Sequence, residues 1–148
     1  MHPILRNILA VVGGLIVGNV VNMGLVILGP SVIAIPEGTD FSTPEGLKES
    51  MPSLSAQHFI FPFLAHALGT LAGAFVAAKI AVSYQMKLAL AIGCFFLLGG
   101  IMMVVLVGGP IWFIATDLIL AYLPMSYLGG CLALGKKKSS MKAPSFSS

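Results

Sequence analysis

The chain has 148 residues, of which 57% are hydrophobic and 9% are charged, and its formal net charge is +3. Its mean hydropathy is +1.00. Soluble domains carry roughly 25% charged residues, so this composition excludes a soluble globular protein, whose surface would need polar side chains that are missing here. The length leaves room for one membrane domain and no separate soluble domain of ordinary size.

Four runs of the chain carry no formal charge: residues 7–36, 50–78, 88–116 and 118–135. About 20 helical residues, at about 1.5 Å each, cross a hydrocarbon core of about 30 Å. Each run holds enough apolar length for one crossing. The sequence therefore predicts an all-α fold, a four-transmembrane-helix bundle with spans at about 8–28, 57–78, 88–107 and 111–134.

Basic residues beside these spans predict the orientation. Arg6, Lys79 and Lys87 lie on one side together with the four lysines of residues 136–148, whereas Lys48 lies alone on the other. Lysine and arginine collect on the cytoplasmic side of membrane proteins. We therefore expect cytoplasmic N and C termini, a cell membrane location (the inner membrane in a Gram-negative bacterium), and a basic, disordered cytoplasmic tail at 136–148.

The connection at 30–56 is expected outside the membrane and is acidic. Within it, Ser42-Thr43-Pro44-Glu45 has the S-x-x-E form of a capping box, with a proline tolerated in the first turn. This pattern predicts a short helix from about Thr43 to Met51, with Leu47 and Met51 on the membrane surface. An unstructured loop is the alternative, because Gly46 weakens so short a helix.

Small residues recur at steps of four in the first two spans, which places each set on one helix face. Such faces let membrane helices approach closely. Because the two spans run antiparallel, we expect a packing seam in which residue 18 meets 69–73 and residue 14 meets 77. The members are Gly14, Gly18 and Asn22 on one span and Gly69, Gly73 and Ala77 on the other.

Polar side chains within the spans need a reason. Counted from the outer helix ends at about 1.5 Å per residue, Asn19, Asn22, His66 and Asp117 all lie about 10 to 16 Å deep. An unpaired carboxylate at that depth is costly, so Asp117 is expected to face the bundle and to pair with His66. Asn22, Asn19 and Thr116 are expected to complete the hydrogen bonds of this candidate intramembrane polar site.

Two interpretations of this polar layer remain open. In the first, interhelical hydrogen bonds of about 1 kcal/mol each determine which helices are neighbours. In the second, a buried Asp and His pair has the mutual perturbation on which proton relays and coupling-ion sites depend. Pro62 and Pro124 interrupt the second and fourth spans, and each forces a kink or a break. Broken helices build sites in transporters, but we expect kinks that shape helix packing.

Several classes of site have no support in the chain. His58 and His66 lie about 12 Å apart along one helix, and no span contains glutamate, so no metal site is expected. No phosphate-binding loop, dinucleotide loop or nucleophile motif is present, and the lysines are not interleaved with exposed aromatics. The expectation is no cofactor, no nucleic-acid partner and no enzymatic activity.

Three segments carry a resemblance: residues 13–24, residues 58–70, and Asp117-Leu118 followed by Pro124. They resemble a group of small, uncharacterised bacterial multi-pass membrane proteins, over most of residues 1–135. The resemblance implies four helices in a bacterial membrane, and it brings no activity to any residue here.

Two roles remain from the sequence alone. The first is a non-enzymatic component of the lipid bilayer that packs with itself, as a homo-oligomer, or with a larger membrane partner. The alternative is a small transporter or proton-coupled carrier that uses the layer of Asp117, His66 and the asparagines.

Overall fold

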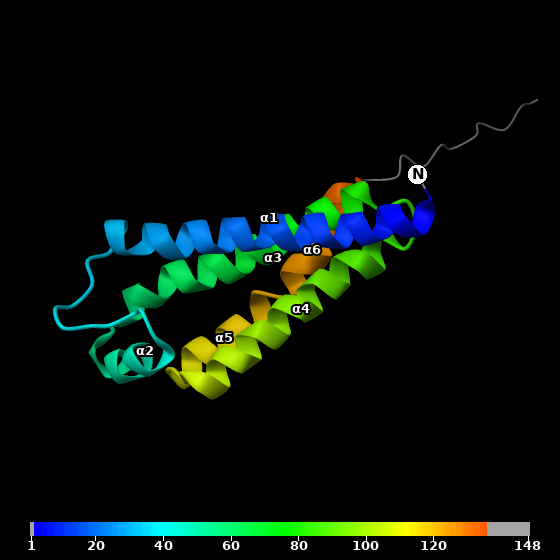
Figure 1. Ribbon diagram of the computed structural model, residues 1–148. Coiled ribbons are helices and arrows are strands. Elements are labelled where there is room, and N and C mark those ends of the chain that lie inside the picture. Colours follow the sequence, from blue (N-terminus) through cyan, green and yellow to red (C-terminus); the bar gives the residue numbers. More distant parts are fainter. Residues whose placement is uncertain (1, 136–148) are drawn as a thin grey trace, which may run out of the picture.

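A computed structural model describes residues 2–135, in which all regular structure is helical (Figure 1). Four helical spans are long and apolar enough to cross a membrane, which confirms the expected all-α bundle. They are α1 (Pro3–Val32), η2 with α3 (Ala56–Phe59 and Ile60–Ile80), α4 (Gln85–Leu106), and α5 with α6 (Ile111–Leu120 and Leu123–Leu134). The basic tail predicted at 136–148 lies outside the described residues.

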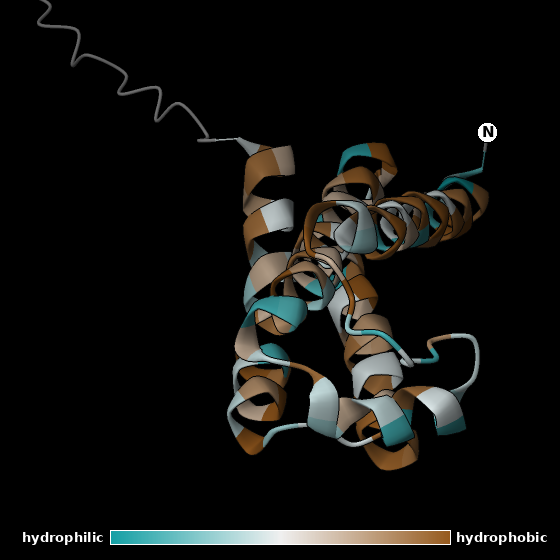
Figure 2. Ribbon diagram, turned by 90° about the vertical axis from the view of Figure 1, so that its left-hand side faces the viewer, coloured by the Kyte–Doolittle hydropathy of each residue, from teal (hydrophilic) through white to brown (hydrophobic). Residues whose placement is uncertain are grey.

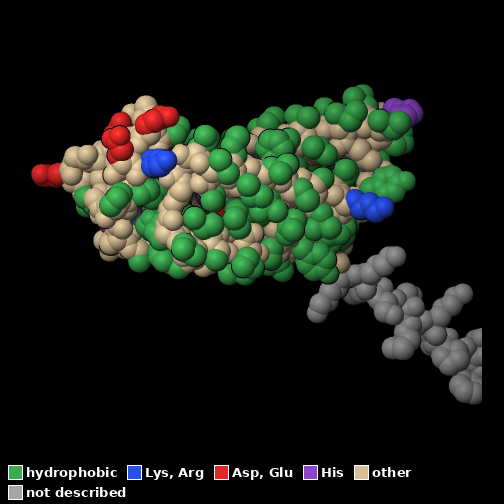
Figure 3. All heavy atoms as spheres, turned by 90° about the horizontal axis from the view of Figure 1, so that it is seen from below, with side chains coloured by type: hydrophobic (Ala, Val, Ile, Leu, Met, Phe, Trp, Pro, Cys, Tyr) green, Lys and Arg blue, Asp and Glu red, His purple; other side chains and the backbone are tan. Residues whose placement is uncertain are grey.

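The outer surface of the bundle is apolar along its length. Of the hydrophobic window of α1, only 11% of residues are buried, and Ile16, Val20 and Ile27 are each more than half exposed. Brown hydrophobic residues run along the helices in Figure 2, whereas hydrophilic ones gather in the connections. Charged side chains gather near the two ends in Figure 3, on either side of an apolar belt. This distribution is that of a membrane-embedded protein.

The first two spans meet along the predicted seam. A Cβ added at Gly73 would lie 2.7 Å from the carbonyl oxygen of Gly14, and one added at Gly69 would lie 2.9 Å from that of Gly18. A Cβ at Gly14 would also lie 2.9 Å from the Cβ of Ala77. These distances confirm the antiparallel register, in which helix backbones touch because glycine leaves room.

Helix α3 is the centre of the bundle, because α1, α4 and α6 all pack against it. Its buried positions are small residues, including Ala74, Ala77 and Ala78, and α6 approaches through Gly129. Small residues at these positions bring the backbones together at the end of the bundle where the described chain begins and ends. Towards the other end, α1 and α3 diverge from α4 and α5 in Figure 1.

The fourth span is broken rather than kinked, which corrects the expectation for Pro124. Helix α5 ends at Leu120, Ala121 and Tyr122 form a turn, and α6 begins at Leu123 with Pro124 in its first turn. Proline has no N–H to donate to the carbonyl four residues earlier, but its restricted φ suits a helix start. The chain therefore stops one helix and starts another inside a single span.

Two further expectations about proline need correction. Pro62 does not interrupt its span, because it lies in the first turn of α3, just after the 3₁₀ turn of η2. The N–H that proline lacks is one of the first four of an α-helix, which have no partner within that helix. Likewise, α1 continues through Pro30 to Val32, so the outer connection begins after residue 32 and not at residue 30.

A short helix, α2 (Pro44–Ser50), forms within the outer connection, and the 3₁₀ turn η1 (Met51–Ser53) follows it. Its cap is Thr43, whose hydroxyl accepts from the backbone N–H of Gly46 at 3.0 Å. The expected cap, Ser42, instead donates its hydroxyl to Asp40 at 2.6 Å. The helix is thus confirmed, with its cap one residue later than expected.

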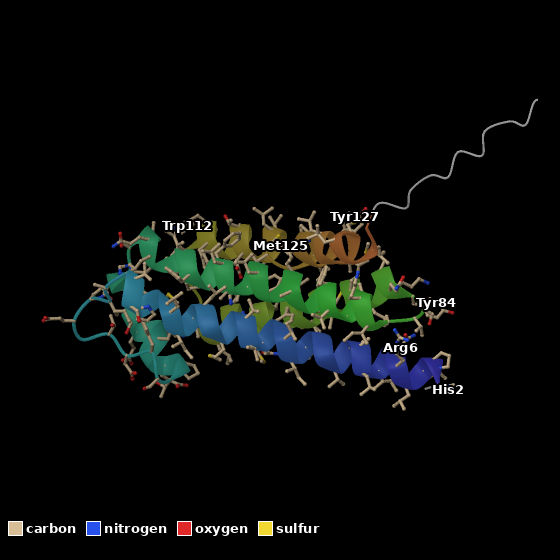
Figure 4. All side chains as sticks on the ribbon, turned by 90° about the horizontal axis from the view of Figure 1, so that it is seen from above. His2, Arg6, Tyr84, Trp112, Met125 and Tyr127 are labelled. Atoms are coloured by element: carbon tan, nitrogen blue, oxygen red, sulfur yellow. The ribbon has the colours of Figure 1, made fainter. Side chains whose placement is uncertain are left out.

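Polar side chains tie the helices together at the end opposite to α2. Arg6 donates from Nε to the carbonyl of Ile80, the last residue of α3, at 2.9 Å. Asn7 donates to Ser83 at 2.8 Å. Figure 4 places Arg6 and Tyr84 at this end and Trp112 at the other. The contacts of Arg6 and Asn7 anchor α1 to the connection between α3 and α4.

Candidate functional site

The structure brings together two of the predicted polar residues, His66 of α3 and Asp117 of α5. His66 Nδ1 lies 2.9 Å from both Oδ1 and Oδ2 of Asp117. An ionised carboxylate only accepts hydrogen bonds, so Nδ1 carries the proton and donates it. The Asp117 side chain is 6% exposed and that of His66 is 24% exposed. The expected pair is therefore present, with the carboxylate buried and the imidazole partly accessible.

Tyr122 is a third member of the site that sequence reasoning missed. Its hydroxyl donates to Asp117 Oδ2 at 2.8 Å, and its ring stacks on the imidazole of His66 with centroids 5.6 Å apart. Its side chain is almost completely buried, and its hydroxyl lies against α4 at Gly100, where an added Cβ would overlap it. Asp117 thus accepts one hydrogen bond from α3 and one from the break in the fourth span.

The break explains how Tyr122 reaches Asp117. In a continuous α-helix, two residues five positions apart differ by about 140° around the axis, so their side chains would diverge. The turn at Ala121 and Tyr122 changes that direction and aims the phenol back at the carboxylate. Pro124, two residues later, is the one signal in the sequence that indicated such a break.

Three other predicted members of the layer are not joined to this pair. Asn19 is exposed and donates to Leu15 of its own helix at 2.9 Å, and Thr116 is exposed and donates to Trp112 at 2.7 Å. Asn22 packs its Cβ against Gly69 in the helix seam and, among the described residues, makes no hydrogen bond to the pair. The predicted depth placed these residues together, but neighbouring helix positions differ by about 100° around the axis.

We name the group of His66, Asp117 and Tyr122 the polar triad. Its His66 and Asp117 line a cavity of about 280 Å³ in the part of the bundle where the helices diverge. The remaining walls are almost entirely apolar and come from α1, α2, α3, α4, α5 and the outer connection. Leu47 of α2 and Met51 of η1 belong to these walls, so they face this cavity, where a place on the membrane surface was expected.

The rim of the cavity indicates where it opens. Val26 of α1 and Met103 of α4 both line it, and both are more than 40% exposed. These two helices make few contacts with each other. Exposed lining residues therefore lie on α1 and α4, within the apolar belt, and also at Phe41 of the outer connection, which is 42% exposed.

The second ring nitrogen of His66 is the accessible polar atom of this pair. His66 Nδ1 is used by Asp117, and no hydrogen bond occupies Nε2 within residues 2–135. If Nε2 were fully buried, it would be a buried nitrogen without a hydrogen-bond partner, and among the described residues it is not such an atom. It therefore retains accessible surface, as a lining residue of the cavity would.

His58 has a separate role at the outer end of the cavity. Its Nδ1 accepts from the backbone N–H of Ser55 at 3.0 Å, so Nε2 carries the proton and donates to the carbonyl of Ala34 at 3.1 Å. This ring joins the connection after α1 to the start of α3. No group of three His, Cys, Asp or Glu side chains is placed to hold a metal ion in the described part of the chain.

Comparisons with protein-family models, with curated proteins and with solved structures each give no match. The resemblance to small bacterial membrane proteins stays a prediction. Any role for this membrane-embedded bundle is therefore argued from the polar triad and the cavity.

Proposed function

We propose that this membrane protein is a small proton-coupled carrier in which His66 and Asp117 bind and release the proton. The observation that carries the proposal is the position of the pair: it joins two helices and also lies at the wall of a cavity. A contact that only holds helices together gains nothing from an accessible imidazole. Ionisable groups within membrane spans mark proton and substrate pathways in many transporters.

The chemistry of the pair suits a single exchangeable proton. With the proton on Nε2, His66 is an imidazolium beside a carboxylate and the pair is neutral. Without it, the imidazole is neutral and the pair carries one negative charge on Asp117. The hydroxyl of Tyr122 donates to that charge in both states. In a medium of low dielectric constant, a net charge on the pair is costly. A ligand that enters the cavity and displaces water would therefore change the affinity of the pair for its proton.

The remaining expectations are part of this proposal. The protein would lie in the cell membrane with both termini cytoplasmic, as the lysines and arginine favour, and would catalyse no reaction. Self-association or a larger membrane partner stays a prediction too. The exposed apolar face of α1 does not favour it, because lipid tails would cover that face equally well.

The proposal predicts proton movement through the protein in liposomes. Purified protein is reconstituted with a pH-sensitive dye trapped inside, the membrane potential is held constant with potassium and an ionophore, and an external pH step is applied. We expect the unmodified protein to move protons faster than protein-free liposomes. Asp117→Asn removes the negative charge that stabilises the imidazolium, so its rate should fall to that of protein-free liposomes.

Two matched variants control for the loss of a polar group in the membrane. Asn19→Leu and Thr116→Val each remove a polar side chain at similar depth that bonds only to its own helix. Both should move protons at the rate of the unmodified protein. Equal rates for Asp117→Asn and the unmodified protein would refute the carrier.

A further inference from the structure

The cavity beside the polar triad supports an inference about what this carrier binds. We propose that it takes a small lipophilic alcohol or phenol from the bilayer, whose neutral oxygen bonds to His66 Nε2 while its apolar body fills the cavity. This inference rests on the proposed function, because it assigns the substrate class of the same site.

The walls determine the body of the ligand. Of the described residues that line the cavity, none is Lys or Arg, and most are apolar, such as Val26, Met103, Val104 and Ile114. The volume of about 280 Å³ lies just below the range of about 300–1,000 Å³ for ligand pockets. A molecule of one ring with a short chain fits this space, whereas a phospholipid is too large for it.

The pair determines the head of the ligand. Both oxygens of Asp117 are engaged, by His66 and by Tyr122, and the carboxylate side chain is only 6% exposed. A cationic head would have to displace those two donors. An anionic head would lie beside Asp117 with no Lys or Arg in the walls to offset it. A neutral head avoids both costs, because buried charge is costly unless it is paired.

The neutral oxygen of an alcohol or phenol can form a hydrogen bond with His66 Nε2 whether the imidazole is neutral or protonated. When His66 is neutral, Nε2 accepts from a hydroxyl, and when it is protonated, Nε2 donates to the lone pairs of the same oxygen. The ligand therefore stays bonded while the proton comes and goes. No bond in the ligand is made or broken.

The opening is consistent with a ligand that arrives from the lipid. Val26 and Met103 are exposed lining residues of α1 and α4, two helices that make few contacts with each other, and both lie in the apolar belt of the molecule. A ligand that partitions into the bilayer would enter sideways, whereas the outer connection and α2 cover the end of the cavity that faces away from the described chain termini.

Photolabelling tests the inference directly. A 4-alkylphenol that carries a diazirine on its chain is irradiated with the reconstituted protein, and the modified peptides are identified by mass spectrometry. We expect saturable labelling of cavity residues, including Met103. Competition should be at least about tenfold weaker for the alkylbenzene that lacks the hydroxyl, since one hydrogen bond to a charged or polarised group is lost. The matching alkyl carboxylate should compete equally poorly.

Two neighbouring positions of α4 provide the variants. Val104 lines the cavity, whereas Val105 is 77% exposed and does not. Val104→Trp should abolish saturable labelling, because its larger side chain occupies the space, and Val105→Trp should leave labelling unchanged. Equal competition by phenol and alkylbenzene would overturn the inference, and this comparison needs no variant to fold. Strong competition by the carboxylate would overturn it as well.

The outcome also separates this inference from the proposed function. If Asp117→Asn stops proton movement but the phenol gives no saturable labelling, the carrier stands and the substrate class is wrong. If the phenol labels the cavity as expected but proton movement is the same in Asp117→Asn, the site binds its ligand without coupling to a proton.

Discussion

Gly73→Leu is expected to separate α1 from the rest of the bundle. A Cβ at this position would lie 2.7 Å from the backbone oxygen of Gly14 and 3.3 Å from the Cα of Gly18. Backbone atoms cannot rotate away, and the larger side chain adds three more carbons. Overpacking commonly costs about 1–3 kcal/mol, and here we expect the upper end or more, because the whole interface between α1 and α3 must open.

The measurement is the free energy of unfolding in mixed detergent micelles. Gly24→Leu is the matched control, because Gly24 lies on α1, the helix that packs against Gly73, and an added Cβ there meets nothing within 4 Å. Gly24→Leu should unfold at the same denaturant concentration as the unmodified protein or at a higher one, since leucine favours helix over glycine. Equal stability of Gly73→Leu and Gly24→Leu would contradict the close contact of α1 and α3.

His66→Phe is expected to be the most destabilising change within the polar triad. The substitution keeps an aromatic ring beside Tyr122 but removes the donor that lies 2.9 Å from Asp117. A carboxylate that is 6% exposed then keeps only the hydroxyl of Tyr122. Leaving a buried charged group without one of its hydrogen-bond partners costs at least about 1–3 kcal/mol, and unfolding in detergent at neutral pH measures this loss.

A second substitution shows whether the charge is responsible. The double variant His66→Phe and Asp117→Asn has no carboxylate left without its partner, so it should be more stable than His66→Phe alone. If the double variant loses as much stability as the single one, the loss comes from packing of the imidazole ring and not from a carboxylate left without its donor.

The spans and the seam between α1 and α3 could be predicted from the sequence, because both follow from the spacing of residues along the chain. Runs without charge give the length of a crossing, and glycines at steps of four give a face. The antiparallel order of two consecutive spans then matches Gly18 with residues 69–73 and Gly14 with Ala77, as the structure confirms. Each of these steps needs only local sequence and the geometry of a regular helix.

The polar layer was predicted only in part, because the place of a residue in a helix bundle depends on its depth along the helix and also on its direction around the helix axis. Counting residues placed Asn19 and Thr116 at the depth of His66 and Asp117, but not on the same side of their helices. Asn19 follows Gly18 of the seam by one residue and is therefore turned about 100° away from it. Thr116 is turned by the same angle from Asp117.

The place of Tyr122 in the site could not be predicted from helical periodicity, because an irregular turn brings it there. A helix that continued from Asp117 would direct Tyr122 elsewhere, so only the break before Pro124 brings its hydroxyl to the carboxylate. The cavity was also unpredictable, since it depends on where α1 and α3 diverge from α4 and α5 and on α2 covering the gap.

The central claim is that the Asp117 carboxylate is present for proton coupling, and that a neutral side chain of the same shape would serve the fold as well; the thermal unfolding of Asp117→Asn tests this claim most directly. Asparagine has nearly the same shape, its carbonyl still accepts from Tyr122, and it removes a costly buried charge. We predict that Asp117→Asn in detergent at neutral pH unfolds at the temperature of the unmodified protein or above it. A clear fall in that temperature would contradict the account, because the carboxylate would then be a contact that holds α3 to α5.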